Sequence, residues 1–236
     1  MTNKGKLFLI PTIISENTQD EVITPNVRKC LAGIHNFLVE DVRTARRYLS
    51  SLKVYDTIET LSFLLLDKDT SEAELSDLFR PVFDGKDLGV LSESGCPGIA
   101  DPGALAARFA HMNDIRVIPL VGPSSILLAL MSSGLNGQNF AFHGYLPIDG
   151  RESAKVIREF EKESRQKNQT QIFIETPYRN NAILKNLLKN LPGETRLCIA
   201  LDVTGESEFI SMRSVKTWQS EPIELPKYPA VFLFLA

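Results

Sequence analysis

In the first half of the chain, short apolar runs alternate with longer segments whose apolar positions recur every three or four residues. A run of four or five apolar residues predicts a buried strand, and the longer period is typical of an amphipathic helix. Strands that alternate with helices in this way form a parallel sheet covered by helices. The strands that we expect in this half are Leu7–Pro11, Phe37–Val39, Leu88–Leu91 and Val117–Leu120.

Capping signals indicate where three helices of this half begin. Thr24 precedes a proline, which suits the first helical position, and Gly33 ends the apolar period that follows. Ser71, with a glutamate three residues later, forms a capping box for a second helix. Asp101, followed by a proline, predicts the start of a third helix.

Beyond residue 121 the strands become longer and closer together. A helix over Pro123–Ser133 marks this change, so we expect an N-terminal domain over 1–120 and a C-terminal domain over 121–236. Three strands near the end indicate a mixed sheet with antiparallel members. The sequence therefore predicts two α/β domains, the first with a mostly parallel sheet and the second with a mixed one. The elements expected in the second half are strand Phe140–Tyr145, helix Glu152–Ser164, strand Gln171–Glu175, helix Arg179–Leu191, and strands Leu197–Leu201, Glu208–Met212 and Ala230–Leu235.

Composition and charge restrict the function classes. The chain has 236 residues, of which 43% are hydrophobic and 23% charged, as in ordinary globular proteins. Its net charge of -3 gives no general attraction for nucleic acid or membranes, so a polyanion would need a local basic patch. The cysteines are few and far apart, which argues against a disulfide scaffold or a zinc site. Since no apolar run approaches the ~20 residues that span a bilayer and no signal peptide is evident, we expect a cytoplasmic protein without a metal.

Two loops are candidates for a ligand site. The segment Ser92–Gly103 is dense in glycine and proline and follows a predicted buried strand, and ligands of open α/β sheets bind at the carboxyl ends of strands. Val121–Ser125 follows the next strand, and its hydroxyls and helix-start N–H groups suit a carboxylate or a ribose. Either loop could instead be a tight connection with a capped helix and no ligand. Cys96 could act as a nucleophile only if a helix lowered its pKa; with no histidine nearby in sequence, we favour a side chain that lines the loop.

Several common catalytic motifs are missing. The chain has no GxxxxGK[ST] phosphate loop, and no GxGxxG follows the first predicted strand, which disfavours an ATPase and an ordinary Rossmann dehydrogenase. GxSxG and HExxH are also missing. The histidines are isolated from one another, which favours packing or surface roles for them.

A charged segment follows the second predicted strand. Glu40 and Asp41 come first, and the arginines Arg43, Arg46 and Arg47 follow within a predicted helix. Arg43 and Arg47 are four residues apart and share one helix face, which creates a local cationic surface for phosphates. The same segment is also compatible with a solvated helix start capped by Asp41. Glu40, Asp41 and Arg43 are the catalytic candidates of this segment.

Six segments, taken in order, resemble motifs of the tetrapyrrole methylase superfamily, the class III S-adenosylmethionine-dependent methyltransferases. Within it, the chain is most similar to the bacterial small-subunit rRNA cytidine 2′-O-methyltransferase branch. The chain departs from that branch at Cys96, where threonine is usual, at Tyr178, where histidine is usual, and over Leu201–Gly205. The similar segments are Leu9–Thr12, Val39–Arg46, Ser92–Gly103, Gly122–Ser124, Phe142–Pro147 and Glu175–Arg179.

The resemblance implies S-adenosylmethionine as the cofactor, bound between two α/β domains, a homodimer, and methylation of a ribose 2′-hydroxyl in ribosomal RNA. Two alternatives stay open: a tetrapyrrole precursor, whose carboxylates would also suit the arginines, and a catalytically silent module that binds the cofactor or RNA. A ribose hydroxyl must lose its proton, and Glu40, Asp41 or Glu175 could accept it, although Glu175 could equally hydrogen-bond its own helix start. The cofactor-binding residues that the resemblance implies are Pro11, Ile14, Gly95, Cys96, Pro97, Ile99, Ser124, Ser125, Glu175 and Ala200.

Overall fold

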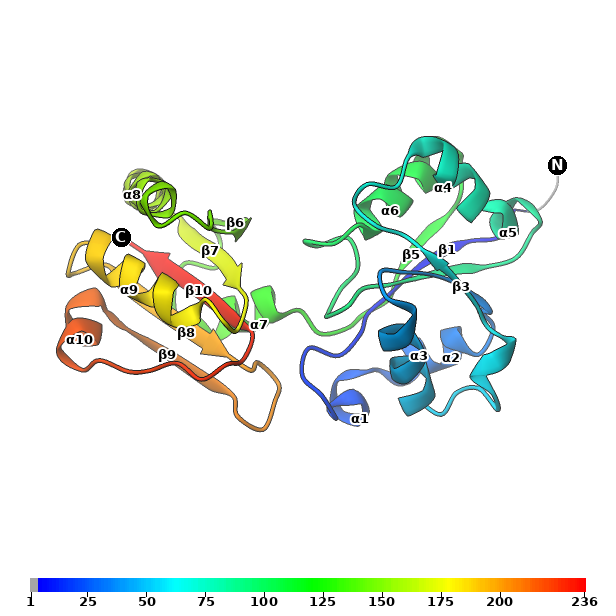
Figure 1. The fold of residues 1–236 in the computed structure, drawn as a ribbon, viewed down its shortest axis with the longest axis horizontal. Coiled ribbons are helices and arrows are strands. Elements are labelled where there is room, and N and C mark those ends of the chain that lie inside the picture. Colours follow the sequence, from blue (N-terminus) through cyan, green and yellow to red (C-terminus); the bar gives the residue numbers. More distant parts are fainter. Residues whose placement is uncertain (1–3) are drawn as a thin grey trace. The chain divides into compact units, whose positions relative to one another are not determined.

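The computed structural model describes residues 4–236 and divides the chain into two compact units (Figure 1). The N-terminal unit extends to Ser124, and the C-terminal unit runs from Ser125 to Ala236. Each unit has one sheet of five strands with helices packed on it, so the α/β fold class is confirmed.

The N-terminal unit contains a fully parallel sheet with the strand order β3-β2-β4-β1-β5. Because neighbouring strands pair in register, their carboxyl ends lie along one edge of the sheet. The four strands expected from the sequence are present, and the expectation omitted β3. The strands are β1 (Leu7–Ile10), β2 (Asn36–Val39), β3 (Ser62–Leu65), β4 (Leu88–Leu91) and β5 (Val117–Pro119).

Two apolar cores cover the two faces of this sheet, because successive strand residues point to opposite sides. Phe8 and Phe37 pack with α2 and α3 in one core, and their neighbours Leu7 and Leu38 pack with α4, α5 and α6 in the other. The helices are α1 (Gln19–Val22), α2 (Pro25–Leu31), α3 (Val42–Ser51), α4 (Glu72–Leu78), α5 (Arg80–Phe83) and α6 (Gly103–Met112), with a short 3₁₀ turn at Ile58–Thr60.

Three of the four caps considered from the sequence are present in this unit. Thr24 and Asp41 each accept a hydrogen bond from a backbone N–H in the first turn, and Ser71 forms the expected capping box. The expectation that α6 starts at Asp101 is wrong, since the helix begins at Gly103. The Asp101 carboxylate instead turns back and accepts hydrogen bonds from two backbone N–H groups of its own loop.

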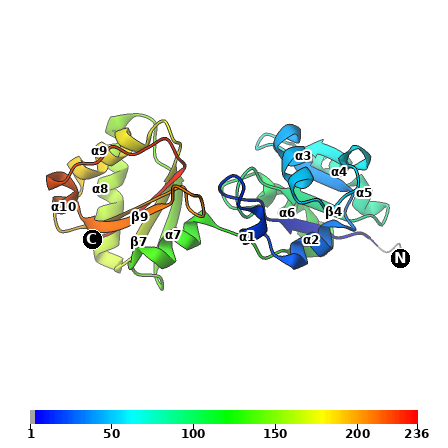
Figure 2. The same cartoon turned by 90° about the horizontal axis from the view of Figure 1, so that it is seen from below.

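The C-terminal unit contains the mixed sheet that was expected, with the order β6-β7-β10-β8-β9. Only β6 and β7 pair in parallel, and the remaining neighbours are antiparallel. The helices α8, α9 and α10 pack on one face of the sheet and α7 packs on the other (Figure 2). The strands are β6 (Phe140–Tyr145), β7 (Thr170–Glu175), β8 (Arg196–Leu201), β9 (Phe209–Ser214) and β10 (Ala230–Leu235). The helices are α7 (Ser125–Ser133), α8 (Gly150–Lys167), α9 (Asn180–Asn190) and α10 (Val215–Ser220).

Two helix starts in this half differ from the prediction. α7 begins at Ser125 rather than at Pro123. α8 begins at Gly150 rather than at Glu152, because the Asp149 carboxylate accepts hydrogen bonds from the N–H groups of Arg151 and Glu152. The prediction lacked α10, a short helix that buries Trp218, whose indole N–H donates to the carbonyl of Leu197 at 3.0 Å.

Candidate active site

Three loops meet at the carboxyl edge of the parallel sheet. The N–H of Thr12, after β1, donates to the carbonyl of Gly95, after β4, at 2.9 Å. The hydroxyl of Ser92 donates to the same carbonyl at 3.0 Å. The thiol of Cys96 donates to the carbonyl of Pro123, after β5, at 3.3 Å. The two glycine-bearing loops are therefore joined to each other and to the turn after β1.

Glycine is required at two points where these loops cross. Gly95 has a φ of +74°, and a Cβ atom there would lie 3.3 Å from the carbonyl oxygen of Pro123. A Cβ atom at Gly122 would overlap the ring of Pro11. Pro11 is itself held in place, because the hydroxyl of Tyr48 donates to its carbonyl at 2.7 Å. The backbones at this edge thus approach as closely as glycine allows.

Asp101 connects the glycine-proline loop to the start of α6. Its Oδ1 accepts hydrogen bonds from the N–H groups of Gly98 and Gly103, both at 2.7 Å. Its Oδ2 is buried and accepts no hydrogen bond from the residues that the structure describes. Burial raises the pKa of Asp101, and the two backbone hydrogen bonds oppose this shift. Asp101 was predicted as a helix cap within the candidate ligand loop Ser92–Gly103, and its buried, unpartnered oxygen is a structural finding.

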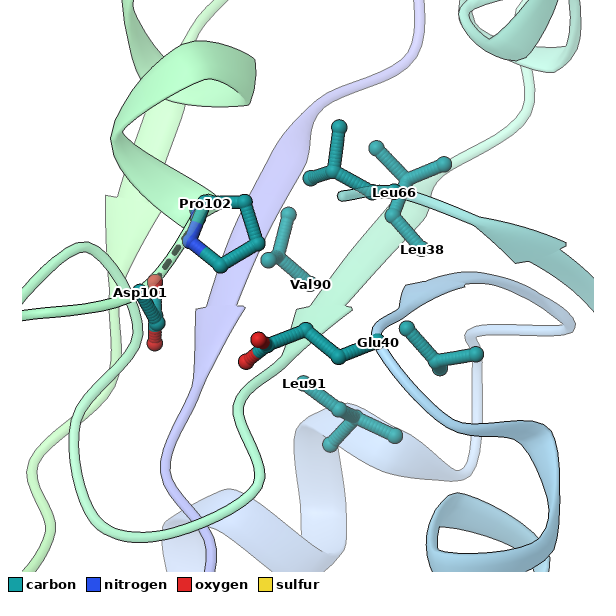
Figure 3. Close-up of a pocket in the computed structure, with 9 residues that line it drawn as sticks. Leu38, Glu40, Leu66, Val90, Leu91, Asp101 and Pro102 are labelled. Carbon is teal, nitrogen blue, oxygen red and sulfur yellow. Dashed lines mark hydrogen bonds between the residues drawn. The ribbon is translucent and has the colours of Figure 1, made fainter. Parts of the chain in front are cut away.

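A small pocket lies beside Asp101 (Figure 3). Apolar side chains from β2 and β4 line it, and the Glu40 side chain points across it toward Asp101. Burial raises the pKa of Glu40, and the nearby charges of Asp101 and Glu93 raise it further. The pKa of Glu93 is raised by its own burial and by the charge of Asp41. The pocket edge therefore concentrates negative charge, which suits a cationic ligand or a hydroxyl that must lose a proton.

The arginines of α3 are not equivalent. Arg46 forms a salt bridge with Glu59 at 2.5 Å, and its guanidinium lies 5.8 Å from the centre of the Phe63 ring. Arg43 and Arg47 are exposed and form no salt bridge within residues 4–236. The cationic surface expected from the sequence is therefore reduced to two side chains.

The surroundings of Cys96 oppose a nucleophilic role. Burial and the charge of Asp101 raise the pKa of this thiol, whereas a reactive thiolate needs a lowered pKa. The thiol also donates a hydrogen bond within the loop junction. Cys96 thus holds the loop together, in agreement with the preferred interpretation of the sequence.

In the C-terminal unit, Glu175 is fully buried at the end of β7. Its Oε1 accepts a hydrogen bond from the N–H of Thr176 at 2.7 Å, and its Oε2 lies 3.2 Å from a guanidinium nitrogen of Arg179 without an aligned hydrogen bond. The same nitrogen of Arg179 donates to the carbonyl of Pro147 at 3.0 Å. Glu175 and Arg179 thereby connect the turn after β7 with the loop after β6. Both carboxylate oxygens of Glu175 face groups of its own unit.

The other predicted cofactor contacts differ in exposure. Pro11 and Pro97 are buried at the loop edge, Ile14 is half-buried, and Ile99 is exposed. Ser124 and Ser125 are half-buried at the junction of the two units along the chain. Ala200 is fully buried on β8, within the apolar core beneath α7. Ser92 and Glu93 belong to the same edge; the sequence singled out their segment, Ser92–Gly103, but gave neither side chain a role of its own.

Within residues 4–236, no group of three or more histidine, cysteine, aspartate or glutamate side chains could hold a metal ion. No helix of that range has the length and apolarity needed to cross a bilayer.

Comparison with known proteins identifies relatives over most of the chain, although no protein-family model matches it. Ribosomal RNA small subunit methyltransferase I from Vibrio cholerae is 30% identical over 230 residues, which cover 96% of this chain and 76% of that protein. The protein of the same name from Buchnera aphidicola subsp. Acyrthosiphon pisum is 27% identical, with coverage of 87% and 69%. The one from Escherichia coli O157:H7 is 27% identical, with coverage of 92% and 68%.

Solved structures share the fold at low sequence identity. The methyltransferase CobJ matches with a TM-score of 0.62 and 16% identity, covering 98% of this chain and 94% of that one. Uroporphyrin-III-C-methyltransferase from Thermus thermophilus matches with a TM-score of 0.57 and 18% identity, covering 98% and 92%. These likenesses confirm the tetrapyrrole methylase fold that the ordered motifs predicted. Together with the Vibrio cholerae relative, which is 30% identical over 96% of this chain, they show that the protein belongs to the ribosomal RNA small subunit methyltransferase I family and is a methyltransferase.

Proposed function

We propose that the protein transfers a methyl group from S-adenosylmethionine to a ribose 2′-hydroxyl of small-subunit ribosomal RNA. The observation that carries this proposal is the 30% identity to a protein of that name over 96% of the chain. One structural neighbour, uroporphyrin-III C-methyl transferase from Thermus thermophilus, is described as complexed with S-adenyl homocysteine, the product form of the same cofactor.

The carboxyl edge of the parallel sheet fits this cofactor. Its glycines bring backbone groups to the surface of the loops, where a Cβ atom would meet Pro123 or Pro11. Oδ2 of Asp101, buried and without a partner within residues 4–236, is a free acceptor for a ligand hydroxyl. The carboxylates of Glu40 and Asp101 would favour the positive sulfonium. Of the cofactor contacts that the resemblance implies, Glu175 and Ala200 have fully buried side chains in the C-terminal unit, so the residues proposed to hold the cofactor are Pro11, Ile14, Gly95, Cys96, Pro97, Ile99, Ser124 and Ser125.

Methyl transfer from this cofactor requires mainly that the protein hold the hydroxyl and the methyl group in the right position. S-adenosylmethionine supplies a methyl group on a cationic sulfur, so the hydroxyl has to be aligned with that methyl. Alignment of this kind can contribute roughly 7 to 11 kcal/mol to lowering the barrier. A ribose hydroxyl also has to lose its proton, and a carboxylate with a raised pKa is the stronger base.

Glu40 is the proposed general base. Burial and the charge of Asp101 raise its pKa, and its carboxylate faces the pocket. Glu175 suits the task less well, because Oε1 accepts from Thr176 and Oε2 faces Arg179. The Asp41 carboxylate caps α3, and the hydrogen bonds that it accepts from Thr44 lower its pKa, which makes it a weaker base. Glu40 would therefore accept the proton, and Arg43 would contact a phosphate of the RNA.

Small ribosomal subunits incubated with methyl-labelled S-adenosylmethionine should acquire label in their RNA. Alkaline hydrolysis should leave the label in a resistant dinucleotide, because a methylated 2′-hydroxyl cannot attack the adjacent phosphodiester. The variant Arg43→Ala/Arg47→Ala should raise KM for the subunits with little change in kcat, since it removes phosphate contacts. Arg108→Ala/Arg116→Ala, which removes two exposed arginines elsewhere on the same unit, is the matched control.

Two outcomes would contradict the proposal. Label in a porphyrinogen, with the ribosomal particle unlabelled, would identify a tetrapyrrole precursor as the substrate. Label in neither, together with measurable binding of S-adenosylhomocysteine, would indicate a silent module.

Glu40→Gln should stabilise the N-terminal unit at neutral pH while it lowers methyl transfer. The pKa values of Glu40, Glu93 and Asp101 are all raised, so these carboxyls bind more protons in the folded state than in the unfolded state. Their contribution to stability is complete below the unfolded pKa of about 4 and is lost as the pH rises through the raised values. Removing one carboxylate should reduce the stability that is lost as the pH rises, because functional sites are often less stable than they could be.

Thermal unfolding at acid and neutral pH measures this effect. The melting temperature of Glu40→Gln should exceed that of the wild type at pH 7 and should change less on acidification. Glu224→Gln, at an exposed carboxylate of the C-terminal unit, should leave the pH profile unchanged. A Glu40→Gln protein that melts below the wild type at pH 7, or that methylates at the wild-type rate, would contradict the role given to Glu40.

A further inference from the structure

Helix α9 differs from the neighbouring α8 in its charges. The residues of α9, Asn180–Asn190, include two lysines and no carboxylate. Lys185 and Lys189 are exposed, lie four residues apart and share one face of the helix. On α8, by contrast, three cations are matched to carboxylates four residues away. The positive charge of α9 is therefore not neutralised within its own helix.

A groove runs beside these lysines. Lys185, Asn186 and Lys189 line one side of it, and Pro147, Gly150 and Ser153 line the other. None of the residues that line the groove is acidic. The groove belongs entirely to the C-terminal unit and shares no residue with the carboxyl edge described above.

Beside the groove, neutral side-chain amides connect α9 to the start of α8. The side-chain amide of Asn186 donates to the hydroxyl of Ser153 at 3.0 Å and to the carbonyl of Gly150 at 3.2 Å. Asn190 donates to the Asn186 amide oxygen at 2.8 Å and accepts from Arg158 at 2.6 Å. These hydrogen bonds hold α9 against the start of α8 and do not use the lysines.

Two carboxylates that lie close in sequence to residues lining the groove already have partners. Glu175 faces Arg179 at 3.2 Å, and Asp149 accepts two backbone hydrogen bonds at the start of α8. Lys185 and Lys189 make no side-chain hydrogen bond or salt bridge within the part of the chain that the structure describes. Both ammonium groups therefore keep their donors for an external anion.

We propose that this groove binds the phosphodiester backbone of the RNA substrate, an inference that rests on the proposed function. The two lysines are separated by about 6 Å of helix rise, and each is a compact point charge suited to phosphate. Since the whole chain carries a net charge of -3, binding of a polyanion depends on local patches of this kind. Contacts to the backbone would orient the RNA without reading its sequence.

The variant Lys185→Gln/Lys189→Gln tests the groove. Binding of purified small-subunit ribosomal RNA should weaken about tenfold at low salt. The slope of log K against log salt should become shallower by roughly 1.5, the amount expected for the loss of two phosphate contacts. KM for ribosomal subunits should rise while kcat stays close to the wild-type value. Titration with S-adenosylhomocysteine should give wild-type affinity and shows that the variant is folded.

The matched control is Lys155→Gln/Lys162→Gln. These lysines project from α8 on the side opposite Ser153 and change the net charge by the same amount. Two results would contradict RNA binding in the groove and leave the proposed function in place. In the first, the groove variant keeps the wild-type RNA affinity and salt slope. In the second, the control variant loses as much affinity and slope as the groove variant. A wild-type protein that binds S-adenosylhomocysteine but neither binds nor labels the RNA would overturn both.

Discussion

Gly122→Ala should lose more than tenfold in affinity for S-adenosylhomocysteine. The added methyl would overlap the ring of Pro11, and neither partner can yield easily. The proline ring is stiff, and its carbonyl is fixed by the hydroxyl of Tyr48 at 2.7 Å. The loop after β5 would have to shift, and the contact between Cys96 and Pro123 would be lost with it. Overpacking at such a site costs about 1 to 3 kcal/mol.

Calorimetric titration and thermal unfolding measure the two effects separately. Gly5→Ala is the matched control, because its added methyl would overlap the backbone at Lys86, next to the start of β4 and away from the loop edge. The control should be destabilised to a similar extent, while its folded fraction binds the ligand with wild-type affinity. Wild-type affinity in Gly122→Ala would show that the loop crossing does not shape the ligand site.

Arg179→Ala should lower the free energy of unfolding of the C-terminal unit by about 3 to 5 kcal/mol, as expected when a buried charge loses its partner. Glu175 has a fully buried side chain, and Arg179 is the cation that faces its Oε2 at 3.2 Å. The arginine also donates to the carbonyls of Pro147 and Leu146, so its loss releases the loop after β6 as well. Chemical denaturation followed by the fluorescence of Trp218, the one tryptophan, reports on this unit.

Two further variants separate charge from hydrogen bonding. Glu175→Gln/Arg179→Ala should recover part of the stability lost in Arg179→Ala, because no buried charge is then left without a partner. Arg179→Lys should fall between the wild type and Arg179→Ala, since it keeps the charge but loses the forked geometry. A loss below about 1 kcal/mol in Arg179→Ala would mean that water reaches Glu175 and that the pair is not structural.

The sequence predicted most of the fold because buried strands and capped helices leave local signals. The runs that became β1, β2, β4 and β5 are short, apolar and followed by turn residues. β3 was omitted although five of the six residues Leu61–Leu66 are apolar, because a short apolar run fits a strand or a buried helix segment equally well. α10 was missed because six residues with polar positions around one tryptophan show no clear helical period.

The site was predicted only in outline. Glycine and proline revealed the loops, and their position after strands indicated which edge of the sheet they occupy. The orphaned oxygen of Asp101, the charge around Glu40 and the crossing of Gly122 over Pro11 depend on which strands become neighbours. The salt bridge that removes Arg46 from the cationic surface joins residues thirteen positions apart, and no short-range pattern contains it.

The two edges of the parallel sheet differ in their tendency to recruit another strand. Among the strands of residues 4–236, β5 pairs only with β1, and the N–H of Leu120 donates inward to the carbonyl of Leu9 at 3.0 Å. Because N–H groups alternate in direction along a strand, the preceding position, Pro119, lies where an N–H would otherwise point outward. A proline there offers an incoming strand no hydrogen-bond donor. β3 is the strand at the opposite edge of the sheet, and its last residue, Leu65, is exposed. Self-association of a partly unfolded N-terminal unit would therefore begin at β3, while β5 remains protected.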